Sequence, residues 1–385
     1  MINSRLLSPI LLLALLLAAA GLKPAMSQDV EVDLGLREGL AFRAPDEGIG
    51  MAFNLRMQQQ VSMFSGDMGE QGLAPQFSTV SRRNRFTFSG YVNDGQMSFL
   101  FMPSLDRGQA GLELAYFNWR VDEQTKLTFG QIKVPLTREF LISSGNLSMV
   151  DRSFVDSRFR QLYDIGIQVK HTLAFDSSVL NLTGAITSGE GGSQPTREGG
   201  YSYTARAEWM PLGQFDAYLT TDVSQSDQPR LALAAAANYN HDAHRAGGSV
   251  GRFLGSSANR INLATYSLDG MYKQNGLSVL AQINHRRVDG ANPYTAFEGS
   301  GYVFQSGYMM SDKTEISARH GYYWPSTDLE AAFQEQRRWV VGWSRYMNGH
   351  DLKIQADLGI IEHFGATPAP DQVDILGRML FQLDF

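Results

Sequence analysis

The sequence predicts an all-β fold, a transmembrane antiparallel β-barrel of about 16 strands with one loop folded inward as a constriction. Three observations support this prediction. Many segments of about ten residues alternate between apolar and polar side chains, which is the period of a strand with two different faces. The connections between these segments alternate between short and long, as they do in outer-membrane barrels. The first residues also have the pattern of an export signal.

The three parts of a secretory signal peptide are present at the start. Arg5 precedes a run of mostly Leu and Ala over residues 6–22, and small residues follow at Ala25 and Ser27. We expect cleavage after Ser27, so that residues 1–27 are removed. A membrane anchor would also fit the length of the apolar run, but the small residues favour cleavage.

The composition argues against several classes of protein. The chain has no cysteine, which rules out disulfides, thiol catalysis and thiolate metal sites. Its formal net charge is −6, which argues against nucleic acid as a partner. The mean hydropathy is slightly negative although 11% of the residues are aromatic. That combination is typical of outer-membrane barrels, because their polar lumen offsets an apolar exterior in contact with lipid.

We expect about sixteen strands in one barrel domain, residues 28–385, because a single-chain bacterial barrel needs an even number. Within this domain, residues 28–49 form a periplasmic N-terminal segment, and residues 211–229 are assigned to a periplasmic connection although part of them alternates. A soluble β-sandwich shows the same alternation but has no reason to sort its loops by length. The expected strands are 50–62, 82–92, 96–104, 111–122, 125–133, 163–172, 178–187, 200–210, 230–241, 260–272, 276–288, 300–310, 314–324, 336–347, 351–362 and 373–385.

The last stretch, DILGRMLFQLDF, alternates like a strand and ends in Phe385. Chain ends usually fray, so a terminal strand with this pattern should be paired on both edges. In a closed barrel it pairs with the first strand, and no edge is left open. Phe385 would then lie at the periplasmic rim on the lipid face. The ending also resembles the C-terminal signal read by the barrel assembly machinery of the outer membrane, which makes that machinery an expected partner.

The connection 134–162 is too long and too apolar to be a freely solvated loop. Folding into the barrel lumen would give its apolar side chains a surface to pack on and would narrow the pore to a constriction. Its apolar residues include Leu136, Phe140, Leu141, Ile142, Leu147, Met149, Val150, Phe154, Val155 and Phe159. Its charged residues are Arg138, Glu139, Asp151, Arg152, Asp156, Arg158 and Arg160.

Strand parity assigns a largely basic set of side chains to the lumen. Arginine suits an anion path because its rigid fork binds carboxylate or phosphate oxygens, and rings of Arg and Lys line anion pores. Each of these residues could instead pair with an acid and only support the structure, as Arg152 could beside Asp151. The basic wall residues are Arg83, Arg85, Lys170, Arg206, Arg286, Arg319, Arg338, Lys353 and Arg378. The candidates for the anion path are Arg83, Arg85, Arg138, Arg152, Arg158, Arg160 and Lys170.

Residues 130–166 carry a resemblance to a known family. The matching residues are Gly130, Gln131, Lys133, Pro135, Glu139, Ser144, Asp151, Arg152, Ser153, Arg160, Asp164, Ile165 and Gly166. Through them the chain resembles the phosphate-selective porin O and P family. The resemblance implies a homotrimeric, sixteen-stranded channel in the outer membrane of Gram-negative bacteria that passes anions through an arginine-lined constriction.

We therefore expect a passive diffusion channel, surrounded by outer-membrane lipid, for small hydrophilic solutes that are anionic or neutral. Phosphate, polyphosphate, organic acids and sugars are all candidates. The alternative is a barrel with a structural or adhesive role through its long outer loops. We expect no enzyme, cofactor or metal site, because the histidines show no catalytic or metalloprotease spacing. His241 and His244 could suggest a metal site but fall in an expected solvated loop.

Overall fold

A computed structural model describes most of the chain after the expected signal peptide. Residues 1–27, the expected signal peptide, lie outside the described residues, as do parts of several long loops. No helix within the described part is both long and apolar enough to cross a membrane. The described residues are 30–36, 38–66, 74–194, 200–255, 260–290, 296–326, 333–364 and 372–385.

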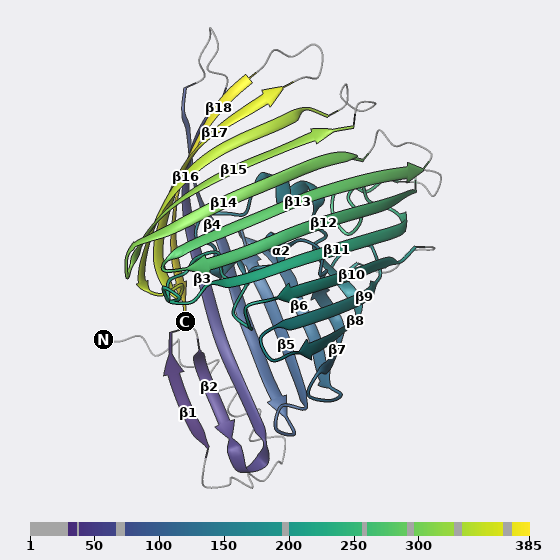
Figure 1. The fold of residues 1–385 in the computed structure, drawn as a ribbon, viewed down its shortest axis with the longest axis vertical. Coiled ribbons are helices and arrows are strands. Elements are labelled where there is room, and N and C mark those ends of the chain that lie inside the picture. The colour runs from purple at the N-terminus through teal and green to yellow at the C-terminus, as the bar shows by residue number, and fades with distance from the viewer. Residues whose placement is uncertain are drawn as a thin grey trace, which may run out of the picture.

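Sixteen antiparallel strands, β3 to β18, form a closed barrel (Figure 1). Each strand pairs with the next, and β18 pairs back with β3, from Ile375 opposite Ser65 to Asp384 opposite Arg56. This confirms the predicted fold class. The strands are β3 (Ile49–Ser65), β4 (Gln76–Val92), β5 (Met97–Asp106), β6 (Gln109–Arg120), β7 (Thr125–Lys133), β8 (Tyr163–Ala174), β9 (Val179–Thr187), β10 (Ser202–Met210), β11 (Arg230–Ala243), β12 (Ile261–Gln274), β13 (Leu277–Gly290), β14 (Gly299–Ser311), β15 (Thr314–Pro325), β16 (Glu335–Asn348), β17 (Leu352–Phe364) and β18 (Gln372–Asp384).

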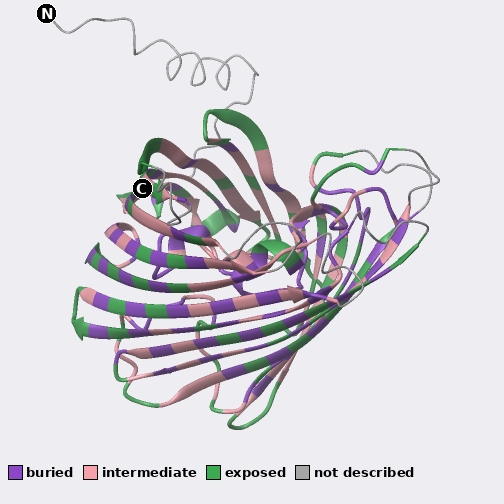
Figure 2. Ribbon diagram, turned by 90° about the horizontal axis from the view of Figure 1, so that it is seen from above, coloured by how far each residue is buried: buried purple, intermediate pink, exposed green. Residues whose placement is uncertain are grey.

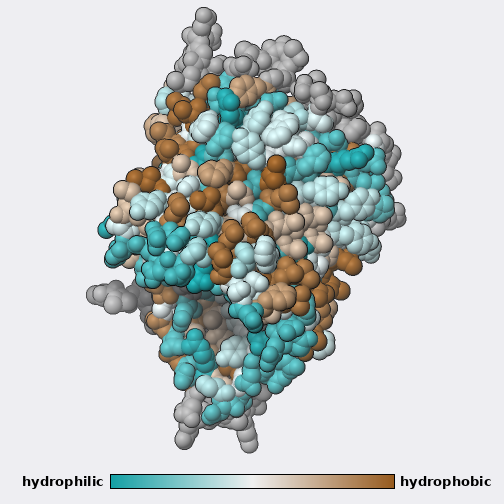
Figure 3. Space-filling view, viewed as in Figure 1, coloured by the Kyte–Doolittle hydropathy of each residue, from teal (hydrophilic) through white to brown (hydrophobic). Residues whose placement is uncertain are grey.

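Buried and exposed residues alternate along the strands (Figure 2). Many of the buried residues are polar and many of the exposed ones apolar, which is the reverse of a soluble protein. In β10 the buried positions include Thr204, Arg206 and Glu208, whereas Tyr203 and Trp209 are exposed. Apolar side chains gather across the middle of the face shown in Figure 3. Polar residues therefore point into the barrel, and the apolar outer face is suited to lipid.

The connection 134–162 lies inside the barrel. It contains α2 (Arg138–Leu141), η2 (Ser144–Asn146) and α3 (Phe154–Phe159). Its apolar side chains are buried, and Ile142, for example, packs with Met271, Leu280 and Val303 of the wall. The expected apolar residues thus fold the loop onto the inner face of the barrel, and its polar groups then find partners there.

Residues 211–229 contain no strand, in agreement with the sequence-based assignment to a connection. This segment also enters the lumen, which the sequence did not predict. The backbone N–H of Thr220 donates to the carbonyl O of Asn146 at 3.2 Å, and its side-chain Oγ1 accepts from the N–H of Ser148 at 2.6 Å. The segment therefore meets the loop 134–162 inside the barrel.

The N-terminal residues 28–49 contain a hairpin that the expected strands do not include. β1 (Glu31–Gly35) pairs with β2 (Gly39–Ala44), a short 3-10 helix η1 (Pro45–Glu47) follows, and β2 pairs with the start of β3. The hairpin occupies the stretch of the β3 edge that lies beyond the end of β18. Gly39 has a φ of +65°, and a Cβ there would lie 1.9 Å from the carbonyl O of Phe53.

A closed barrel with a fully paired backbone should resist unfolding by detergent. We therefore predict that unboiled and boiled samples migrate differently on a denaturing detergent gel. Identical migration of the two samples, together with an α-helical circular dichroism spectrum, would contradict the barrel.

Candidate functional site: the lumen

Arg138 of α2 is fully buried in a cluster with two acids and a second arginine. Its Nε donates to Asp269 Oδ1 at 2.6 Å and its Nη2 to Glu208 Oε2 at 2.7 Å. Arg206 also binds Asp269, through Nη1 at 2.7 Å and Nη2 at 2.9 Å. Two positive and two negative charges thus balance, so Arg138 anchors the loop to β10 and β12 with its charge neutralised.

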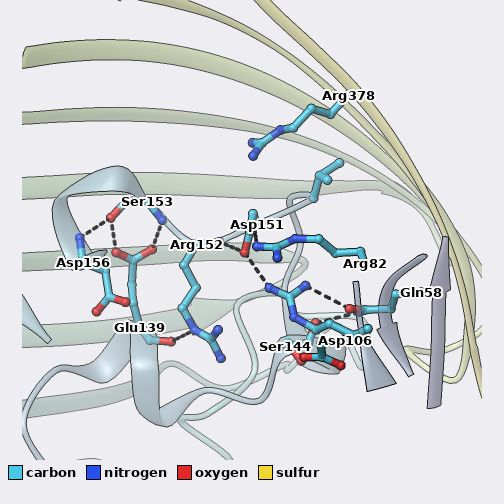
Figure 4. Close-up of polar contacts among 12 residues, drawn as sticks. Gln58, Arg82, Asp106, Glu139, Ser144, Asp151, Arg152, Ser153, Asp156 and Arg378 are labelled. Carbon is cyan, nitrogen blue, oxygen red and sulfur yellow. Dashed lines mark hydrogen bonds and ion pairs between the residues drawn. The ribbon is translucent and has the colours of Figure 1, made fainter. Parts of the chain in front are cut away.

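A second anchor is formed by Asp151, which is held by two arginines of β4. Arg83 Nη2 lies 2.8 Å from Asp151 Oδ1, and Arg82 contacts the other carboxylate oxygen (Figure 4). Burial alone would raise the pKa of Asp151, but the charges of Arg83 and Arg82 hold it well below the usual range. Asp151 is therefore ionised and fixes the middle of the loop against β4.

Arg82 was not predicted, because strict alternation places it on the outer face beside lumen-facing Arg83. In the structure Gln58 pairs with Arg83 while Gln59 pairs with Ser81, so Arg82 is the extra residue of a β-bulge. A bulge reorients one side chain, and here two consecutive arginines reach the same carboxylate. The sequence contains no signal for this, since a bulge changes the register without changing the composition.

Arg85 has no acidic neighbour in the sequence, but its guanidinium is matched by two acids of neighbouring strands. Arg85 Nη2 lies 2.8 Å from Asp106 Oδ2 and 2.9 Å from Glu113 Oε2. These partners lie more than 20 residues away in sequence, so they become visible only once β4, β5 and β6 are placed together. Arg83 and Arg85 are thus paired wall residues.

The arginines of the loop differ in their surroundings. Arg152 donates through Nε to the carbonyl O of Glu139 at 2.6 Å (Figure 4). Its Nη2 donates to the carbonyl O of Ile142, also at 2.6 Å. Burial, and then the charge of Arg83, lowers the pKa of Arg152 to about 10, so it remains charged at neutral pH. Arg160 Nη1 lies 3.1 Å from Asp156 Oδ2. Both side chains therefore also hold the shape of the loop.

Arg158 is the exposed arginine of α3. Its Nη2 donates to the hydroxyl of Tyr323 at 2.7 Å, and its guanidinium lies 4.8 Å from the centre of that ring. Within the described residues no carboxylate lies within 4.0 Å of it. Arg158 therefore presents an uncompensated positive charge.

Lys170 belongs to a row of three cations on the inner face of β6, β7 and β8. Lys126 lies opposite both Arg120 and Lys170 in the strand register. Among the described residues, no ion pair joins any of the three to an acid. Lys126 and Arg120 were not named from the sequence, although the alternation of their strands could have placed them on the lumen face.

Lys126 and Lys170 of this row border a lumen cavity of about 310 Å³. The cavity lies between β6–β10, the start of the loop 134–162 and Tyr218 of the segment 211–229. A larger hollow of about 1020 Å³ lies on the apolar outer face, beside Ile167, Ile186 and Tyr266. The hollow faces lipid, so the lumen cavity is the candidate site for hydrophilic solutes.

The histidines singled out from the sequence have local partners. His244 Nδ1 contacts Glu190, and His241 Nδ1 lies 3.0 Å from Asn262 Oδ1. In the described part of the chain, no three His, Asp or Glu side chains are grouped as metal ligands would be.

A comparison with protein families matches residues 51–322 to the model of phosphate-selective porins O and P. The chain belongs to this family. The anion-selective porin from Comamonas acidovorans has a similar fold, with a TM-score of 0.57 and 9% sequence identity over 87% of this chain and all of that one. The outer-membrane channel DcaP of Acinetobacter baumannii gives a TM-score of 0.56 and 10% identity over 88% of this chain and 98% of that one.

The outer-membrane protein OmpT of Vibrio cholerae, solved in a trimer form, gives a TM-score of 0.53 and 12% identity over 87% of this chain and 99% of that one. At these identities the likeness concerns the fold alone. No protein with a curated functional description matches the sequence. Family membership and barrel identify this porin as an outer-membrane channel and point away from an enzyme.

We predict that Arg138→Met destabilises the folded porin, because it leaves Asp269 and Glu208 buried with one cation fewer. The free energy of unfolding should fall by about 3–5 kcal/mol, as measured by equilibrium denaturation of the detergent-folded protein. Arg107→Met, at the exposed β5–β6 turn, is the control and should change it by less than about 0.5 kcal/mol. Equal effects of the two changes would show that the cluster does not anchor the loop.

Proposed function

We propose that this porin is a passive diffusion channel that prefers small anions, phosphate among them. One observation carries the proposal, namely that Lys126 and Lys170 line the lumen cavity without an acidic partner in the described part of the chain, whereas Glu208, which also lines it, is bound by arginine. The lumen-facing carboxylates of Asp151, Glu208 and Asp269 are each bound by arginine. In contrast, Lys126 and Lys170 face the cavity, and no acid pairs with them among the described residues.

The position of the loop supports a path along this cationic wall. Hydrogen bonds join the loop 134–162 to β3, β4, β10, β12–β18 and Lys133 at the end of β7. Examples are those from Lys353 Nζ to the carbonyl O of Leu147 at 2.6 Å and from Ser344 Oγ to that of Ser148 at 2.6 Å. The free space lies on the other side, beside β6–β9. Charges in a narrow passage are screened less than charges in bulk salt, so unpaired lysines there should bias permeation.

The residues named from the sequence divide into two groups under this proposal. Lys170 and Arg158 act on the permeating solute because their charges are unpaired. The remaining arginines hold the wall and the constriction loop, because acids or backbone carbonyls use their donors; these are Arg83, Arg85, Arg138, Arg152 and Arg160.

The proposal extends to export and assembly. Residues 1–27 act as the signal peptide, 28–385 form the mature domain with 28–49 in the periplasm, and 134–162 are the constriction loop. We also infer a homotrimer, supported by the trimer form solved for OmpT of Vibrio cholerae. Chemical cross-linking of the detergent-folded porin should then give a product of about three chains and no larger species.

We predict that changing Lys126 and Lys170 together to Glu shifts the reversal potential under a KCl gradient towards cation preference. The reason is that two uncompensated positive charges become negative at the cavity. Lys313→Glu, at the exposed β14–β15 turn, should leave the reversal potential nearly unchanged. The measurement is made in planar bilayers on wild type and both variants. A wild-type channel without anion preference would refute the proposed selectivity, as would equal shifts in the double variant and the control.

Deletion of Phe385 should reduce the amount of porin in the outer membrane more than it alters the conductance of the inserted channels. The backbone N–H of Phe385 donates to the carbonyl O of Leu55 at 2.9 Å, so this residue completes the pairing of β18 with β3 far from the cavity. Phe385→Tyr keeps an aromatic end and serves as the control. Membrane fractionation gives the amount inserted, and wild-type levels of the truncated chain would disprove a role for Phe385 in assembly.

A further inference from the structure

The side chains on the inner faces of β6 and β7 change from charged to apolar along the strands. The charged ones lie near the short turns, and the apolar ones lie near the loop 134–162. The inner faces of β6, β7 and β8 are in register, so their side chains form rows across three strands. The first row is cationic, the second is neutral and polar, and the third contains two glycines. In the last row Leu114 of β6 and Ile132 of β7 border the cavity. Asp164 of β8, opposite Ile132, is bound by Ser188 and the backbone N–H of Gly189. In this order the rows are Arg120, Lys126 and Lys170; Asn118, Thr128 and Gln168; Tyr116, Gly130 and Gly166; and Leu114, Ile132 and Asp164.

The cationic end of the cavity contains two ammonium groups that can donate hydrogen bonds to a ligand. Lys126 and Lys170 both line the cavity, and neither has a carboxylate partner in the described part of the chain. Lys133, which also borders the cavity, is different because its Nζ donates to the carbonyl O atoms of Phe140 and Leu141 at 3.0 Å each. A ligand anion would therefore be bound by the first two ammonium groups.

The opposite end has an aliphatic patch beside Lys133, Arg206 and Glu208, whose charged groups already have partners within the protein. Leu114 and Ile132 of the wall lie near Leu141 and Pro135 of the loop, and all four border the cavity. In the third row Gly130 and Gly166 lie close to the neighbouring strands, since a Cβ there would lie 2.3 Å from the carbonyl O of Ala115 and 2.1 Å from that of Ile186, respectively. Tyr218 forms one flank of the cavity. Its hydroxyl donates to Glu208 at 3.0 Å, so a ligand would contact its ring.

We propose that this cavity binds a small organic carboxylate with an apolar body. The carboxylate lies between Lys126 and Lys170, and the apolar part lies under the loop beside Leu114 and Leu141. The inference rests on the anion preference proposed above and names the class of anion. A volume of about 310 Å³ is at the lower end of the range for small-molecule sites.

Inorganic phosphate fits this cavity less well. Phosphate is bound best by several N–H groups or by a guanidinium fork. Arg206 is the arginine among the residues that line the cavity, and its guanidinium is already bound to Asp269 through both terminal nitrogens. The aliphatic end also gives no partner to phosphate oxygens, whereas it can bury the hydrocarbon of a carboxylate.

The test measures how benzoate, acetate and inorganic phosphate reduce the KCl current through the porin in planar bilayers. Benzoate should halve the current at a concentration about tenfold lower than acetate, because its ring gains apolar contact. Phosphate should be no more effective than acetate. Equal effects of benzoate and acetate, or a stronger effect of phosphate, would overturn the inference.

Two variants and a control locate the site. Lys126→Gln with Lys170→Gln should weaken the effect of benzoate by about tenfold or more, because two charged donors are lost. The matched change Lys313→Gln at the exposed turn should have no effect. Leu114→Thr should reduce the advantage of benzoate over acetate while the effect of acetate is kept. Retention of that advantage would place the ring elsewhere and refute the inference.

The outcomes separate this inference from the proposed function. A channel that prefers cations in KCl would overturn both. Anion preference in KCl without discrimination among the three probes would overturn the carboxylate site and leave the proposed function standing.

Discussion

The structure depends on one constraint, that a backbone N–H or C=O facing hydrocarbon must find its partner within the protein. Pairing of β18 with β3 meets it by removing both edges of the sheet. Once the sheet is closed, the two faces of every strand have different surroundings. The apolar face contacts lipid and the polar face lines the lumen, so a chain with only 43% apolar residues is suited to a membrane.

A polar lumen has in turn to accommodate its own charges. Loop 134–162 does so by bringing Arg138 to Glu208 and Asp269, and Asp151 to Arg82 and Arg83. Buried pairs of this kind contribute little net stability but are costly to break. They therefore fix the position of the loop, and with it the side of the barrel on which space remains. The unpaired lysines of β7 and β8 lie on that side.

The strands were predictable because lipid on one face and water on the other require apolar and polar residues to alternate. Turn residues then mark where each alternating segment ends. The same regularity predicts Lys170, Arg206 and Glu208 on the inner face, and all three line the lumen cavity. It failed where the period is broken locally, as at the bulge of Arg82, and where a pattern is short, as in the hairpin of β1 and β2. Partners could not be predicted at all, because the pairing of Arg85 with Asp106 and Glu113 joins residues brought together only by the closed sheet.

The loop fills the lumen unevenly, and this has a consequence for how the chain tolerates substitution. The inner faces of β12–β18 are committed to the loop through contacts such as those of Lys353 and Gln355 with the carbonyl O of Leu147. The inner faces of β6, β8 and β9 make few such contacts with the loop. Natural variation can therefore retune which solutes pass by exchanging side chains on those three strands, while the other half of the barrel preserves the architecture.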